Sequence, residues 1–157
     1  MRDRCPAAVT AAIAVMASLT IPPAAQAIPN SNCPLSTPVA EVSSLADVPA
    51  ALRELLPPIA DIGAPFNSTD AVLDASLPFR RLIRAGHSGQ DWFLWYEHGG
   101  ITYFWQAVVA RLAGQGGPVT VLANIGTISD VLCAVTDGTL AGNMPPYPPT
   151  AWAESSF

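Results

Sequence analysis

The chain has 157 residues, of which 50% are hydrophobic and 12% are charged, and its formal net charge is −5. This composition excludes global disorder, and the length predicts a single domain. An acidic chain without any lysine lacks the cations with which proteins neutralise phosphates, so nucleic acid is excluded as the main ligand. The missing lysine also excludes Schiff-base chemistry and a phosphate-binding P-loop.

The first 27 residues have the three-part layout of a secretory signal peptide. Arg2 and Arg4 precede an uncharged apolar run, Ala7–Leu19, and Ala25–Ala27 supplies the small-x-small cleavage pattern. The alternative is an uncleaved anchor, but the apolar run is short of the roughly 20 residues that span a bilayer. We therefore expect cleavage after Ala27, export to the periplasm or the medium, and no transmembrane span in the mature chain.

Two cysteines, Cys33 and Cys133, remain after this segment. In an exported chain such a pair most often forms one disulfide, which here closes a loop of about 100 residues. The alternative is a reactive thiol, because Ser129 is the expected cap of a helix whose early turns carry Cys133. The two cysteines and two histidines show no metal-ligand spacing, so neither a metal site nor another cofactor is predicted.

The segment before residue 78 predicts an extended strap, a short helix and a long loop. The strap, Ile28–Ala40, is rich in proline and serine. The helix, Val48–Leu56, begins after Asp47 and ends at two prolines. The loop, Pro58–Pro78, contains turn residues around scattered apolar residues that are expected to pack on the core. Loops of this length are often functional or contain a further element.

The stretch Pro78–Leu112 predicts three antiparallel strands joined by glycine-containing turns, because it is rich in aromatic and β-branched residues. Turns of three residues would pair Arg81 with Glu97 in the first hairpin and Trp95 with Tyr103 in the second. The middle strand is apolar on both faces. This pattern favours a central strand covered above and below, or a strand with one face in a pocket or partner surface.

A fourth strand, Val119–Ile125, and a second helix, Ser129–Leu140, complete the predicted domain. The expected fold is α+β: an antiparallel meander of about four strands, with a C-terminal helix and a short N-terminal helix packed on one face, and one disulfide. The expected organisation is a signal peptide (1–27), a single domain (28–142) and a proline-rich tail (143–157).

Motifs for catalysis are weak, and no catalytic residue is assigned. The segment Gly86–Gln90 resembles a nucleophile elbow, but glutamine stands where a glycine is required and a strand follows instead of a helix. His87 can meet Asp91 across the first turn as a polar site, in which a carboxylate orients a base. The alternative is a turn histidine with local hydrogen bonds. His98 is expected at the other end of the middle strand, too far from His87 for one site.

An aromatic surface is the last candidate site. Trp92, Tyr96 and Phe104 are expected on one sheet face, which, if uncovered, suits an apolar ligand, a glycan or a partner protein. The alternative is that all three residues belong to the core. The function expected is a small, secreted or periplasmic, non-catalytic binding module of unknown ligand. The alternatives are an extracytoplasmic hydrolase that uses His87, Asp91 and Ser88, or a purely structural envelope component.

Overall fold

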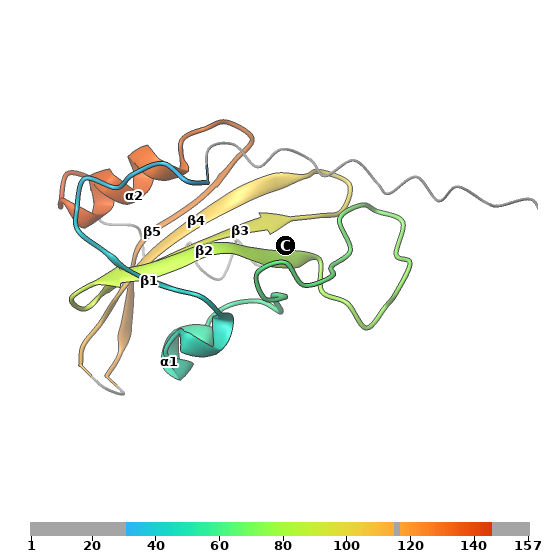
Figure 1. Ribbon diagram of the computed structural model, residues 1–157, viewed down its shortest axis with the longest axis horizontal. Coiled ribbons are helices and arrows are strands. Elements are labelled where there is room, and N and C mark those ends of the chain that lie inside the picture. Colours follow the sequence, from blue (N-terminus) through green and yellow to red (C-terminus); the bar gives the residue numbers. More distant parts are fainter. Residues whose placement is uncertain (1–30, 115–116, 146–157) are drawn as a thin grey trace, which may run out of the picture.

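The computed structural model describes residues 31–114 and 117–145, and Figure 1 shows their arrangement. Five strands form one antiparallel sheet in sequence order: β1 (Ala40–Val42), β2 (Arg80–Ser88), β3 (Asp91–His98), β4 (Phe104–Leu112) and β5 (Val119–Thr127). A 3-10 helix, η1 (Leu45–Asp47), and a one-turn helix, α1 (Ala50–Arg53), follow β1, and a longer helix, α2 (Leu132–Leu140), follows β5. The predicted signal peptide and residues 146–157 of the predicted tail lie outside the described residues.

The expected antiparallel meander with a C-terminal helix and one disulfide is confirmed, but the sheet has five strands instead of about four. The additional strand is β1, which pairs with β2 through only three residues. So short a strand offers no alternation for a sequence pattern to reveal. Across the described ranges, no helix has the length and apolarity needed to cross a membrane.

Both helices are shorter than the sequence predicts. α1 covers only four residues, and Pro49 instead of Asp47 occupies its N-cap position. α2 begins at Leu132 instead of Ser129. The backbone N–H of Ser129 donates to the Thr127 hydroxyl at 2.9 Å, which holds this residue in a turn before the helix. Ser129 therefore forms part of the turn that follows β5 and does not cap α2.

The central strand β3 is buried on both faces, as its sequence predicts. Phe93 and Trp95 belong to the core on the face covered by α2, and neither side chain is exposed. Leu94 points to the opposite face and packs with Val48 and Leu52 from the segment around α1. The expectation that both helices pack on one face is therefore wrong, and Figure 1 shows α1 and α2 on opposite sides of the sheet.

The β2–β3 hairpin contains a bulge that was not predicted. Arg81 faces Glu97, which confirms the expected pair, but the register shifts by one residue at Ile83. Beyond the bulge Ser88 faces Asp91, so the turn contains two residues instead of three. A shift of one residue reverses which side chains share a face of the sheet. This shift decides the geometry of the candidate site described below.

The β3–β4 connection is longer than predicted. His98 faces Phe104, so five residues form the connection and Trp95 does not face Tyr103. The backbone N–H of Gly99 donates at 2.7 Å to a carbonyl of the segment that leads into β2. That segment also packs against Gly99 so closely that a β-carbon there would clash with backbone atoms. The glycine therefore serves a close contact between two loops and does not form a tight turn.

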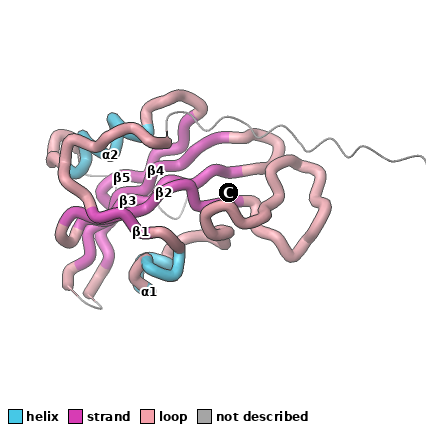
Figure 2. Tube along the Cα trace, in the orientation of Figure 1, coloured by secondary structure: helices cyan, strands magenta, loops and turns pink. Residues whose placement is uncertain are grey.

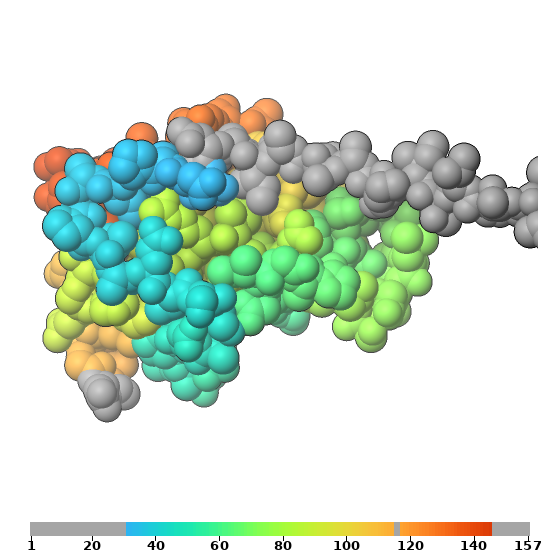
Figure 3. All heavy atoms as spheres, viewed as in Figure 1, coloured from blue at the N-terminus to red at the C-terminus, as the bar shows by residue number. Residues whose placement is uncertain are grey.

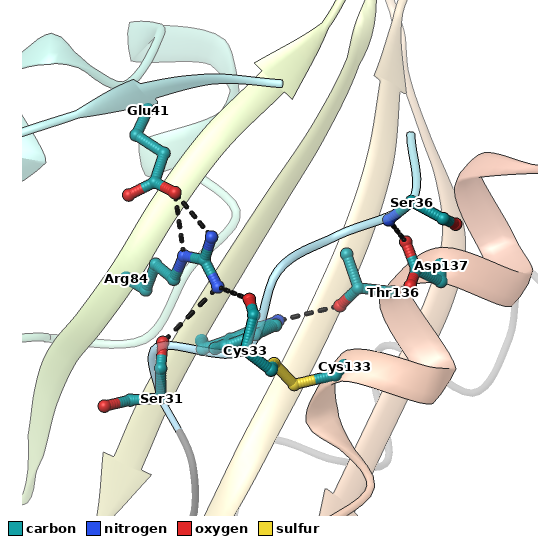
Figure 4. The surroundings of a disulfide bond; sticks show 9 residues. Ser31, Cys33, Ser36, Glu41, Arg84, Cys133, Thr136 and Asp137 are labelled. Carbon is teal, nitrogen blue, oxygen red and sulfur yellow. Dashed lines mark hydrogen bonds and ion pairs between the residues drawn. A yellow bond between two sulfur atoms is a disulfide. The ribbon is translucent and has the colours of Figure 1, made fainter. Parts of the chain in front are cut away.

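The disulfide Cys33–Cys133 ties the strap before β1 to α2, as Figure 4 shows. It confirms the predicted pairing and excludes the alternative of a reactive Cys133 thiol. The guanidinium of Arg84 on β2 donates to the Cys33 carbonyl at 2.8 Å. On the same face, the indole N–H of Trp95 donates to the Thr136 hydroxyl of α2 at 2.8 Å. A covalent bond and two long-range hydrogen bonds thus hold the strap and α2 over β2 and β3.

Replacement of both cysteines by serine should lower the free energy of unfolding by up to about 4.7 kcal/mol, since the closed loop holds about 100 residues. Equilibrium denaturation of the oxidised protein and the double variant measures this difference. The wild type with its disulfide reduced is the control, and it should match the variant. A loss of well under about 1 kcal/mol would contradict this prediction.

Candidate functional site

A hollow of about 540 Å³ lies beside the β2–β3 turn, between α1 and the sheet, and we name it the hairpin groove. It is larger than the hollows next to Arg84 (about 230 Å³) and Pro57 (about 350 Å³). The described residues that line it come from α1, the hairpin and the end of β4: Pro49, Ala50, Ala51, His87, Gly89, Gln90, Trp92, Leu112 and Gly114. This lining contains no charged side chain.

The wall of the groove is a stacked pair of rings. His87 and Trp92 face each other across β2 and β3, and their ring centroids are 4.6 Å apart with an angle of 27° between the planes. Both side chains are half-buried. The Nδ1 atom of His87 is buried and has no hydrogen-bond partner. The two stacked rings thus form one wall of the groove.

The groove exists because the cover on this side of the sheet is thin. Val48 and Leu52 are fully buried and anchor the segment around α1 to the core. Ala50 and Ala51 face the hairpin with small side chains, so they leave space that larger residues would fill. On the sheet side, the backbone N–H of Leu112 donates to the Gln90 carbonyl at 3.0 Å and fixes the turn against the end of β4.

The predicted aromatic surface is only partly formed. Trp92, Tyr96 and Phe104 lie on one face, as expected from the pairing of β3 with β4. Tyr96, however, is only 6% exposed, and its burial raises the pKa of its hydroxyl to about 12. Phe104 stacks on His98 at 4.6 Å, at the far end of the strand. Trp92 alone of the three lines the groove, so the surface open to a ligand is limited to this end.

The predicted polar site is not assembled in the structure. The carboxylate of Asp91 accepts two hydrogen bonds from Arg111, at 2.6 and 2.8 Å. Asp91 faces Ser88, whereas His87 faces Trp92. Because neighbouring residues of a strand point to opposite faces, His87 lies on one side of the sheet and Ser88 and Asp91 lie on the other. A base, an orienting carboxylate and a nucleophile do not converge here.

A buried carboxylate near the other end of β3 had not been predicted as a site. Glu97 is only 2% exposed, and it accepts hydrogen bonds from the Arg81 guanidinium and the Tyr103 hydroxyl. Arg81 also donates to the Ala64 carbonyl and lies over the Phe66 ring, 4.4 Å from its centroid. The cluster joins the 64–78 loop to the β3–β4 connection. Its signal in the sequence is the Arg81–Glu97 pair, which by itself predicts only a cross-strand contact.

Burial raises the pKa of Glu97 above its ordinary value of 4.5, and the hydrogen bond and charge of Arg81 oppose this effect. No group of three or more histidine, cysteine, aspartate or glutamate residues in the described part of the chain is arranged to hold a metal ion. Comparisons with protein-family models, with curated proteins and with solved structures found no match. The geometry of the groove is therefore the observation on which a function can be argued.

The variant Glu97→Gln tests the raised pKa. The folded protein holds the Glu97 proton more tightly than the unfolded chain does, so ionisation above pH 4.5 destabilises the fold. The variant should therefore become more stable relative to the wild type as the pH rises from about 4 to about 8. Urea denaturation at a series of pH values measures this shift.

Asp61→Asn is the matched control with the opposite sign. The Ser44 hydroxyl and two backbone N–H groups donate to Asp61, and they lower the pKa of its carboxyl. Its ionised form therefore stabilises the fold. The unfolding free energy of the variant should fall relative to that of the wild type as the pH rises. If the stability of Glu97→Gln relative to the wild type falls as the pH rises, as that of Asp61→Asn should, the assignment of the Glu97 pKa is wrong.

Proposed function

We propose that the protein is an exported, non-catalytic binding module that holds an apolar ligand in the hairpin groove. The observation that carries the proposal is the groove itself, an open hollow of about 540 Å³ walled by the Trp92 and His87 rings. Its volume falls within the range of roughly 300–1,000 Å³ found for small-molecule sites. A largely apolar lining with a few polar groups is also typical of such sites.

The lining restricts the chemistry of the ligand. A charged ligand would lose hydration in the groove without gaining a partner of opposite charge from the described lining residues. A glycan needs several hydrogen-bonding side chains, and the described lining offers three: His87, Gln90 and the indole N–H of Trp92. An uncharged, mainly apolar molecule that packs on the face of Trp92 fits best.

Two further observations support export. The first 27 residues have the pattern of a signal peptide, and a disulfide that spans most of the chain is typical of oxidising compartments. The hydrolase alternative is weaker, because His87 lies across the sheet from Ser88 and Asp91. A purely structural envelope component has no need of an open groove, so this alternative also explains less.

Titration with the neutral apolar dye N-phenyl-naphthylamine tests the proposal, because the dye fluoresces when it enters an apolar site. The wild type should bind it, and Trp92→Ala should weaken binding roughly tenfold or more by removing the wall. A second variant, Ala51→Phe, should weaken binding by filling the groove while leaving Trp92 in place. Thermal unfolding of each variant checks that the fold is kept.

Trp105→Ala is the matched control, since Trp105 packs on the opposite face of the sheet and does not line the groove. It should bind the dye as the wild type does. The proposal fails if the dye does not bind the wild type. It also fails if dye binding to folded Trp92→Ala and Ala51→Phe equals that of the control.

A further inference from the structure

The end of the molecule opposite the hairpin groove carries the most exposed large aliphatic side chains of the described residues. Leu73 and Ile101 are each 93% exposed, Ile128 is 74% exposed and Val72 is 50% exposed. Among the other large hydrophobic residues that the structure describes, Ile62 has the highest exposed fraction, 42%. We name the four residues the apolar rim: Val72, Leu73, Ile101 and Ile128.

The rim residues come from three separate loops that the sheet brings to one edge. The 64–78 loop leads into the start of β2, and the 99–103 connection joins β3 to β4. Arg80 faces His98, His98 faces Phe104, and Thr127 faces Trp105, so the ends of the four strands lie side by side. Figure 2 shows these loops in pink beyond the strands. The three loops therefore share one end of the sheet, although they lie far apart in the sequence.

Two hydrogen bonds of Asn67 close the 64–78 loop. Asn67 is only 5% exposed, and its side-chain amide donates to the Asp74 and Leu77 carbonyls at 2.8 and 2.9 Å. These bonds close the loop that carries Leu73, which forms a rounded projection at the right of Figure 3. A surface that is already ordered loses little conformational entropy when a partner binds. Aliphatic side chains that protrude from such a loop can pack on an apolar face of another molecule.

The negative charge of the loops that carry the rim favours a partner with basic groups. Asp70, Asp74 and Asp130 are exposed in the same loops, and residues 64–78, 99–103 and 128–131 contain no lysine or arginine. Two copies that met through this end would bring carboxylates of like charge together. An anionic membrane would repel the same carboxylates, and a neutral membrane would have to accept them at its surface without a compensating cation. Basic groups on a protein would instead attract them.

We propose that the apolar rim is the docking surface for a protein partner that offers an apolar face bordered by basic side chains. The aliphatic side chains pack on that face, and the aspartates fix the orientation through ion pairs at its border. This inference concerns the end of the sheet remote from the hairpin groove, and it does not depend on a ligand in that groove.

A labelled amphipathic helical peptide of leucine and lysine serves as the probe, and fluorescence anisotropy with the full mature chain measures its binding. The wild type should bind the peptide, with an affinity that falls as salt is added. The triple variant Leu73→Ser, Ile101→Ser and Ile128→Ser should weaken binding roughly tenfold or more. Asp70→Asn, Asp74→Asn and Asp130→Asn together should remove most of the salt dependence.

The double variant Ile62→Ser and Met144→Ser is the matched control, because it removes two partly exposed aliphatic side chains outside the rim. It should bind the peptide as the wild type does. A peptide with glutamate in place of lysine should not bind. Dye binding in the hairpin groove should be unchanged in the rim variant, which separates failure at one site from failure at the other.

Several outcomes would overturn the proposal. One is that the lysine peptide does not bind the wild type, or that it binds the folded rim variant equally well. A second is that the wild type sediments with phosphatidylcholine vesicles and the rim variant does not, which would identify a lipid surface as the occupant. A third is that sedimentation equilibrium shows a dimer of the wild type but not of the rim variant, which would identify a second copy of this chain as the occupant.

Discussion

Burial of β3 on both faces is the constraint on which the rest of the structure depends. Its alternate residues belong to two separate cores, so the sheet needs a cover on each side. One cover is formed by the strap, the disulfide and α2, and the other by the short segment around α1. The two covers are held by different interactions. The first is tied by a covalent bond and by the Arg84 and Trp95 hydrogen bonds, whereas the second depends mainly on buried aliphatic side chains.

This asymmetry explains why the groove lies where it does. On the α2 side, the indole of Trp95 is fully buried and its N–H is bound by Thr136, so no polar atom of this ring is left for a ligand. On the α1 side, the cover stops short of the hairpin, and the equivalent bulky ring of Trp92 is left partly open. The same strand therefore supplies a structural tryptophan to one face and a candidate ligand-binding tryptophan to the other.

The sequence predicted those features that depend on alternation and local propensity. The antiparallel meander, the central position of β3, the Arg81–Glu97 pair and the disulfide are of this kind. It did not predict β1, whose three residues carry no pattern, or the bulge at Ile83, which has no local signal. The bulge had the largest effect, because a one-residue shift separates His87 from Asp91 and places it beside Trp92. The hairpin groove is lined by His87 from the predicted polar site and by Trp92 from the predicted aromatic surface.

The disulfide has a consequence beyond stability. Cys33 and Cys133 enclose all five strands, α1 and every connection between them in one covalent ring. A peptidase that cuts the exposed stretch around Leu73 would open this ring without dividing the molecule, because both fragments stay joined through sulfur. The groove and the rim, at opposite ends of the sheet, would then still belong to one particle. The bond that holds the strap in place also makes a nicked chain inseparable for as long as its surroundings stay oxidising.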